Sequence, residues 1–110
     1  MRRLFSYGTL QLPRVQLETF GRELMGEPDS LSGWVKTQIE ITDLDVLRAS
    51  GERFHPGLVP GDGPRITGTV FELTDAELAA ADAYEVSDYE RIEVMLDSGT
   101  RAFVYVARSR

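Results

Sequence analysis

Near the start of the chain stands Leu4-Phe5-Ser6-Tyr7-Gly8-Thr9-Leu10, and Pro13 follows three residues later. The apolar start of this stretch predicts a strand over residues 3–7, which Gly8 ends. Pro13 suits the first position of a helix, where a missing N–H costs nothing. A strand that turns into a helix in this way leaves backbone N–H groups without partners. Those groups and the positive end of the helix dipole favour a small anion such as a carboxylate, although an ordinary connection shows the same pattern.

Length and composition indicate one globular domain over residues 1–110. The net charge of −6 argues against a nucleic-acid partner, because phosphate binding needs a basic face. There is no cysteine, which excludes disulfides, thiolate catalysis and sulfur-ligated metals. The apolar runs are too short to span a membrane, so we expect a cytoplasmic protein with no membrane partner. The oligomeric state is not decided by the sequence.

The first helix is expected to run from Pro13 to about residue 25. Leu17, Phe20 and Leu24 would form its apolar face, because they lie at helical spacing. Turn residues over 26–32 should then end it.

The middle of the chain is expected to hold one clear strand. Residues 34–41 alternate between apolar and polar side chains, as a half-exposed strand does. A strand edge is possible at residues 46–47. Residues 55–64 are dense in glycine and proline and are expected to be mostly loop, with room for a very short strand at residues 58–59.

The last third shows stronger patterns. Residues 65–73 predict a strand, and Gly68 within it suggests a bulge or the close approach of another backbone or a ligand. Thr74 and Glu77 form a capping box, so a helix should follow directly and end near Tyr84 or Glu85. The chain should close with a hairpin of two alternating runs, residues 91–96 and 102–107.

Together these elements predict an α+β fold. We expect a small, mostly antiparallel, curled sheet or barrel of five to seven strands, with two main helices packed outside. The predicted core is Leu4, Phe5, Leu17, Phe20, Ile39, Val70, Leu78, Ile92, Val94, Val104 and Val106.

Glu85 is the carboxylate whose position stands out. It falls on the helix face that Leu78 and Ala81 turn inward, near the negative end of the helix dipole and one turn after Asp82. Burial and both negative fields would raise its pKa toward the range useful for proton transfer. The alternative is a Glu that swings into solvent or forms a surface ion pair.

The residues resemble a known family at three places, in the same order along the chain. Residues 5–10 are similar to the Tyr-Gly-Thr-Leu signature of the gamma-glutamylcyclotransferase-like family. Residues 55–61 and 68–73 are similar to its middle portion. Residues 81–85 and 89–94 are similar to the segment in which a helix ends in the catalytic Glu and a Tyr and an Arg open the next strand.

This resemblance implies a cyclotransferase for gamma-glutamyl amines or gamma-glutamyl amino acids. The substrate's α-amine would attack its γ-carbonyl and release 5-oxoproline and the free amine, with neither metal nor cofactor. Glu85 would be the catalytic base. The backbone amides of Gly8, Thr9 and Leu10 would bind the carboxylate or the oxyanion. Tyr7 and Tyr89 would wall the cavity and donate hydrogen bonds to the substrate.

Other chemistry finds little support. His55 is the only histidine and has no clustered acids beside it, so no metal site is predicted. The chain also departs from the family pattern at Val86, where a Gly is usual, and at residues 11–14. These departures leave open an alternative, in which a protein of the same fold binds a gamma-glutamyl or 5-oxoproline-like metabolite without turnover.

Overall fold

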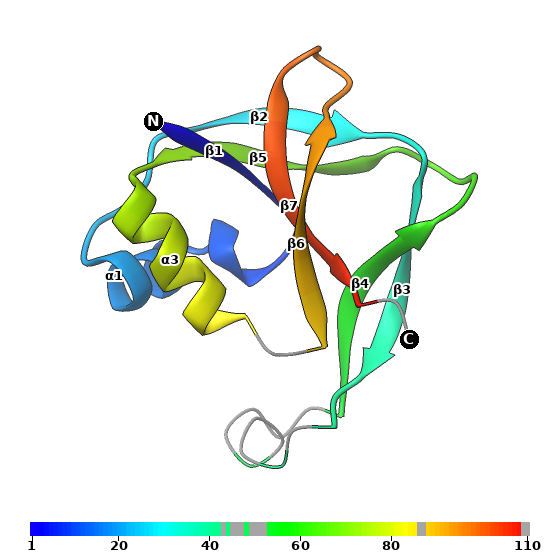
Figure 1. The fold of residues 1–110 in the computed structure, drawn as a ribbon, viewed down its shortest axis with the longest axis horizontal. Coiled ribbons are helices and arrows are strands. Elements are labelled where there is room, and N and C mark those ends of the chain that lie inside the picture. Colours follow the sequence, from blue (N-terminus) through cyan, green and yellow to red (C-terminus); the bar gives the residue numbers. More distant parts are fainter. Residues whose placement is uncertain (43, 45–47, 49–52, 86–87, 109–110) are drawn as a thin grey trace.

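The computed structural model describes residues 1–42, 44, 48, 53–85 and 88–108 (Figure 1). The possible strand at residues 46–47 therefore lies outside the described residues. The described elements, in chain order, are β1 (Arg2–Ser6), η1 (Thr9–Gln11), α1 (Pro13–Phe20), β2 (Gly26–Leu31), β3 (Trp34–Glu40), β4 (Phe54–Pro60), β5 (Ile66–Leu73), α3 (Asp75–Tyr84), β6 (Tyr89–Met95) and β7 (Arg101–Ala107).

β1 is the central strand of a five-stranded sheet with the order β2-β5-β1-β7-β6. It pairs antiparallel with β5 on one side and parallel with β7 on the other. Leu4 and Phe5 are only 1% exposed, which agrees with the interior strand expected from the opening sequence. Because β1 is central, the turn that follows it is anchored on a strand held from both sides.

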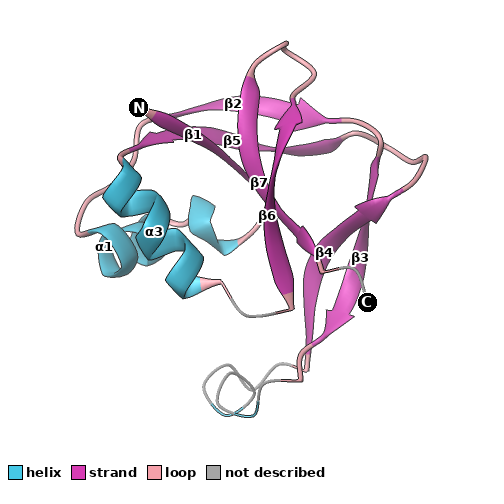
Figure 2. Cartoon of the chain, viewed as in Figure 1, coloured by secondary structure: helices cyan, strands magenta, loops and turns pink. Residues whose placement is uncertain are grey.

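The fold class and the terminal hairpin are confirmed. β6 and β7 pair antiparallel, from Tyr89 with Ala107 to Met95 with Arg101. The described strands form a five-stranded and a two-stranded sheet, so they do not close into a barrel, and the curled-sheet alternative is the correct one (Figure 2).

β4 corrects the expectation that residues 55–64 are mostly loop. It pairs antiparallel with β3 along its whole length, from Trp34 with Pro60 to Glu40 with Phe54. Its prolines are tolerated because each strand of a two-stranded sheet is an edge, where a proline can leave the ladder intact.

The predicted turn over residues 26–32 is also wrong, because Gly26–Leu31 forms strand β2 against β5. Pro28 fits because β2 is the edge of its sheet. A Cβ on Gly26 would lie 2.5 Å from the Phe71 ring, so only glycine allows this close approach. The signals of residues 26–32 are local turn signals, whereas the strand arises from pairing with a distant segment.

The first helix is shorter than predicted. α1 ends at Phe20, because Gly21 takes a left-handed conformation with φ of 76°. Leu17 is 51% exposed, so its assignment to the core is wrong. The residues that α1 buries are Val15 and Gln16.

The helices α1 and α3 lie on the same side of the molecule (Figures 1 and 2). Arg22, just after α1, donates two hydrogen bonds to Glu77 in the first turn of α3, at 2.6 and 2.9 Å. This ion pair lowers the pKa of Glu77 to about 2. The predicted capping box of Thr74 and Glu77 is present and starts α3.

The core prediction holds for most members. Five are buried, namely Leu4, Phe5, Leu78, Val104 and Val106. Five more are half-buried and pack against the core, namely Phe20, Ile39, Val70, Ile92 and Val94. The core therefore joins the sheet to the inner face of α3 through Leu78 and Ala81.

Candidate functional site

The turn after β1 holds backbone amides that lack strong partners among the described residues. Gly8 caps the short η1 helix, and its N–H reaches only the Ser6 hydroxyl, at 3.4 Å. The N–H groups of Thr9 and Leu10 have no acceptor among the described residues. A Cβ on Gly8 would meet no heavy atom within 4 Å, so the space beside it is open. Unpartnered N–H groups with open space beside Gly8 are the features that the predicted anion site requires.

Two glutamines hold this turn in place. Gln11 donates to the carbonyl oxygen of Gly8 at 3.3 Å and accepts from the Thr69 hydroxyl on β5 at 3.0 Å. Gln16 is 3% exposed and donates to the Leu10 carbonyl at 2.8 Å, while its own oxygen accepts from the Leu24 N–H at 2.8 Å. The sequence analysis missed Gln16, because a polar residue carries no signal of burial when its partners are distant backbone groups.

Glu85 is the C-terminal cap of α3, one turn after Ala81, whose carbonyl accepts its N–H at 3.0 Å. Leu78 and Ala81 are buried, so the expected inward face exists. Burial raises the pKa of Glu85 from 4.5 to about 7. Its carboxylate has no hydrogen bond or ion pair with another described residue, so its charge is not neutralised by a neighbour.

The expected contribution of Asp82 to that pKa does not appear. Asp82 instead accepts a 2.7 Å hydrogen bond from the Tyr105 hydroxyl and pairs with Arg91 at 3.1 Å. These partners compensate its charge. Desolvation alone accounts for the raised pKa of Glu85.

Three tyrosine side chains lie near the Glu85 carboxylate. Burial raises the pKa of Tyr7, Tyr89 and Tyr105 above the ordinary range, and the negative charge of Glu85 adds to the rise at each; at Tyr105 the Asp82 carboxylate contributes more than Glu85 does. The Tyr7 hydroxyl donates to the Tyr105 carbonyl at 2.7 Å, and the Tyr89 hydroxyl donates to the Pro56 carbonyl. Since both protons are directed at backbone carbonyls, the two phenolic oxygens present lone pairs to an incoming donor. This differs from the donor role expected for them.

The two halves of the predicted site meet at a side-chain contact. The hydroxyls of Thr9 and Tyr84 are 2.7 Å apart and share a hydrogen bond. Tyr84 directly precedes Glu85, and Tyr7 directly precedes Gly8. The end of α3 and the turn after β1 are therefore neighbours. Val86 lies outside the described residues.

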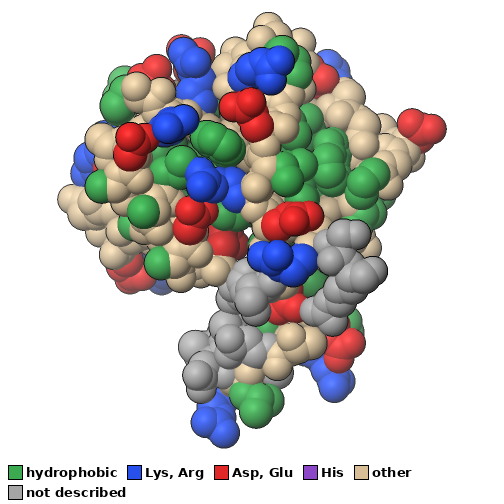
Figure 3. Space-filling view, viewed as in Figure 1, with side chains coloured by type: hydrophobic (Ala, Val, Ile, Leu, Met, Phe, Trp, Pro, Cys, Tyr) green, Lys and Arg blue, Asp and Glu red, His purple; other side chains and the backbone are tan. Residues whose placement is uncertain are grey.

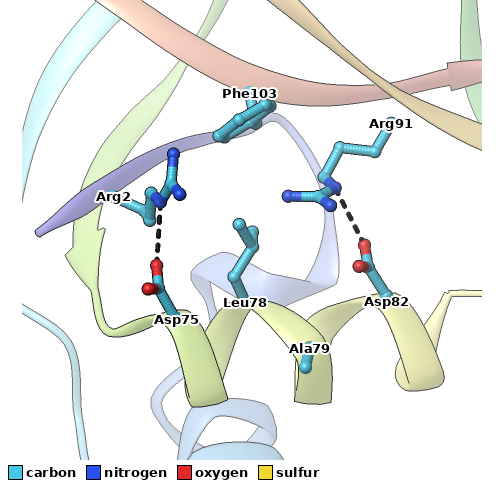
Figure 4. A pocket seen from close by; sticks show the side chains of 7 residues that line it. All are labelled: Arg2, Asp75, Leu78, Ala79, Asp82, Arg91 and Phe103. Carbon is cyan, nitrogen blue, oxygen red and sulfur yellow. Dashed lines mark hydrogen bonds and ion pairs between the residues drawn. The ribbon is translucent and has the colours of Figure 1, made fainter.

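A pocket elsewhere on the molecule does not contain the predicted site residues. It has a volume of about 260 Å³ and lies beside α3, with lining residues Arg2, Asp75, Leu78, Ala79, Asp82, Arg91 and Phe103 (Figure 4). Both of its arginines are paired, Arg2 with Asp75 at 2.8 Å and Arg91 with Asp82 at 3.1 Å. Basic and acidic side chains accordingly alternate over this face (Figure 3). A chain of hydrogen bonds links it to the predicted site, because Tyr105 donates to Asp82 of the pocket and accepts from Tyr7.

Within the described parts of the chain, no group of three or more His, Cys, Asp or Glu residues is arranged to hold a metal ion. None of the described helices has the length and hydropathy to cross a membrane. His55 lies in β4 and is half-buried.

Tyr105 is the site neighbour that sequence reasoning missed. It stands between Val104 and Val106 in β7, all three are buried, and its place in the sequence is that of an ordinary core residue. Only the fold reveals its role, because β7 pairs with β1 and the Tyr105 carbonyl accepts the hydrogen bond of the Tyr7 hydroxyl.

Comparison with known proteins places these residues in a family. The family model described as "Gamma-glutamyl cyclotransferase, AIG2-like" matches residues 4–110. No significant match was found among the curated proteins.

Solved structures share the fold. A solution structure from Arabidopsis thaliana is 26% identical with a TM-score of 0.71, and the match covers 96% of this chain and 61% of that one. A second Arabidopsis thaliana structure is 23% identical with a TM-score of 0.73, covering 96% and 68%. A structure titled gamma-glutamyl cyclotransferase is 14% identical with a TM-score of 0.73, covering 98% and 67%. The chain thus spans about three-fifths to two-thirds of the length of these proteins.

Proposed function

The chain belongs to the gamma-glutamyl cyclotransferase, AIG2-like family, and we propose that it converts a gamma-glutamyl compound into 5-oxoproline and a free amine. The observation that carries this proposal is the Glu85 carboxylate, whose pKa burial raises to about 7 and which directly follows Tyr84, the residue bonded to Thr9 in the turn with unpartnered amides. A base with a pKa near neutrality is suited to proton transfer at physiological pH.

Substrate binding would use the turn after β1. The amides of Gly8, Thr9 and Leu10 would hold the glutamyl α-carboxylate or the oxyanion that forms at the γ-carbonyl. The phenolic oxygens of Tyr7 and Tyr89 would accept hydrogen bonds from the α-ammonium, because their own protons are directed elsewhere. This arrangement would fold the glutamyl chain so that its nitrogen faces its own γ-carbon.

The reaction would then be intramolecular. Glu85 takes a proton from the α-ammonium, and the freed amine attacks the γ-carbonyl carbon to form the ring C–N bond. The tetrahedral intermediate collapses and the original amide C–N bond breaks as Glu85 returns that proton to the leaving nitrogen. The ring nitrogen gives up its second proton to the released amine, which departs as an ammonium ion. Atoms and charge balance without a further reactant.

The first test is release of 5-oxoproline from a panel of gamma-glutamyl amino acids and amines. Glu85→Gln should lower turnover by at least about a hundredfold, as loss of a general base does. In the wild type, kcat/KM should fall with decreasing pH below about 7, because protonated Glu85 cannot accept the proton. Near-normal turnover of Glu85→Gln would remove this residue from the mechanism.

The non-catalytic alternative gives a different result. A protein that only binds the metabolite would be stabilised against heat by 5-oxoproline and would release none from any member of the panel. Wild-type turnover that Glu85→Gln abolishes would exclude that alternative.

A further inference from the structure

Lys36 is a cation close to the candidate site. It lies in β3 opposite Leu58, which is fully buried, and residues opposite each other on paired strands share a face. The Lys36 side chain therefore leaves β3 on the face toward the five-stranded sheet. Its Nζ lies 5.8 Å from the centroid of the Tyr7 ring, within cation–π range.

The charge of Lys36 is not compensated by a neighbouring acid. Its Nζ has no carboxylate within ion-pair distance among the described residues, whereas Arg2, Arg22, Arg53, Arg91 and Arg101 each have one. Glu85 is not its partner, since burial alone sets the shift at that carboxyl. Lys36 is exposed, so its ammonium can meet a solute.

Two kinds of group that suit an anion therefore adjoin Tyr7. The amides after Gly8 follow it in the chain, and the ammonium of Lys36 lies over its ring. On the proposed function, the amides hold the glutamyl α-carboxylate, and a second anion at Lys36 must come from the other end of the substrate. A gamma-glutamyl amino acid has a carboxylate there, and a gamma-glutamyl amine does not.

We propose that Lys36 binds a carboxylate on the part of the substrate that leaves, and so directs the enzyme toward gamma-glutamyl amino acids. This inference rests on the proposed function and deepens it by naming the substrate class. The recognition is a charge-assisted contact at a partly solvated site, so it should weaken as salt concentration rises.

The test compares two substrates that differ by one carboxylate, gamma-glutamyl-alanine and gamma-glutamyl-ethylamine. The wild type should favour the alanine compound in kcat/KM by about tenfold, the scale of one hydrogen bond to a charged group. Lys36→Met keeps an aliphatic side chain without the charge and should abolish this preference, and Lys36→Arg should retain most of it. Arg101→Met, which removes a positive charge from an exposed residue of β7, is the matched control and should leave the preference intact.

The outcomes separate the two proposals. If Lys36→Met lowers kcat/KM equally for both substrates, or leaves their ratio unchanged, the inference about Lys36 is overturned while cyclotransfer stands. If the wild type releases 5-oxoproline from neither substrate, the proposed function fails, and the inference fails with it.

Discussion

The hydroxyls of Thr9 and Tyr84 lie 2.7 Å apart, although 75 positions separate the two residues in the chain. Thr9 belongs to the turn after β1, and Tyr84 is the last residue of α3. Their hydrogen bond ties the turn with the unpartnered amides to the residue before Glu85. The relative position of the proposed anion site and the proposed base therefore depends on a contact at the surface of the molecule.

Tyr84→Phe should reduce kcat/KM severalfold while changing the free energy of unfolding by no more than about 1 kcal/mol, because the lost hydrogen bond is exposed. Thr9→Val removes the same bond from the other side. The double variant should show no loss in kcat/KM beyond that of the single variants. Fully additive losses, measured by initial rates, would contradict this coupling.

Gln16→Leu should destabilise the protein strongly, although the two side chains are similar in volume. The substitution leaves the Leu10 carbonyl and the Leu24 N–H without their 2.8 Å partners inside the structure. Each buried unpaired group costs about 1–3 kcal/mol, so the free energy of unfolding measured in urea should fall by about 2–6 kcal/mol. Glu18→Leu, at an exposed position of the same helix, is the control. It should change the free energy of unfolding by less than about 1 kcal/mol, as substitutions at surface sites usually do. A neutral Gln16→Leu would mean that the turn does not depend on this residue.

Gly68 and Gly8 offer a matched pair of glycine substitutions. A Cβ on Gly68 would lie 2.3 Å from the Ser6 carbonyl oxygen and 2.9 Å from the Phe5 ring, so Gly68→Ala should cost at least about 2 kcal/mol of stability. A Cβ on Gly8 meets open space, and Gly8→Ala should change stability by less than about 1 kcal/mol. Its methyl group would instead obstruct the proposed anion site and raise KM. Thermal unfolding measures the stability of both variants, and initial rates measure the KM of Gly8→Ala. A Gly68→Ala protein as stable as the wild type would contradict the close approach of β1 and β5 at this position.

The sequence predicts those parts of the site that depend on local spacing. The half-buried position of Glu85 agrees with its spacing from Ala81 and Leu78, one and two turns earlier, and the unpartnered amides follow a glycine between a strand and a helix. β2 and β4 escape prediction because their turn-forming residues are outweighed by pairing with distant strands.

The inner face of α1 escapes prediction for a related reason. Helical spacing selects Leu17, yet the helix buries its neighbour Gln16, whose amide satisfies two backbone groups outside the helix. Hydrophobic periodicity cannot detect a polar residue that is buried for its hydrogen bonds. The same limit applies to Tyr105, whose role depends on the adjacency of β1 and β7.

The pH dependence of stability provides a test of Glu85 that needs no substrate. Its pKa is about 7 in the folded protein and 4.5 in the reference state, so the folded protein binds the proton more tightly. Stability is therefore lost as pH rises from about 4.5 through about 7, by up to about 3 kcal/mol if the whole shift is realised. Gln is neutral at every pH and does not undergo this loss.

Glu85→Gln should accordingly match the wild type in free energy of unfolding near pH 4 and exceed it at pH 8, as measured by urea unfolding at each pH. Other titrating groups, such as Glu77 with its pKa of about 2, are common to both proteins and cancel in the difference. Glu23→Gln removes one carboxylate from an exposed side chain and controls for net charge. A constant difference between Glu85→Gln and the wild type across this range would show that the carboxylate is solvated, and it would remove the physical basis for using Glu85 as a base near neutral pH. A growing difference would mean that the protein gives up stability to keep a desolvated proton acceptor at this half-buried position, as expected of a carboxylate kept for proton transfer.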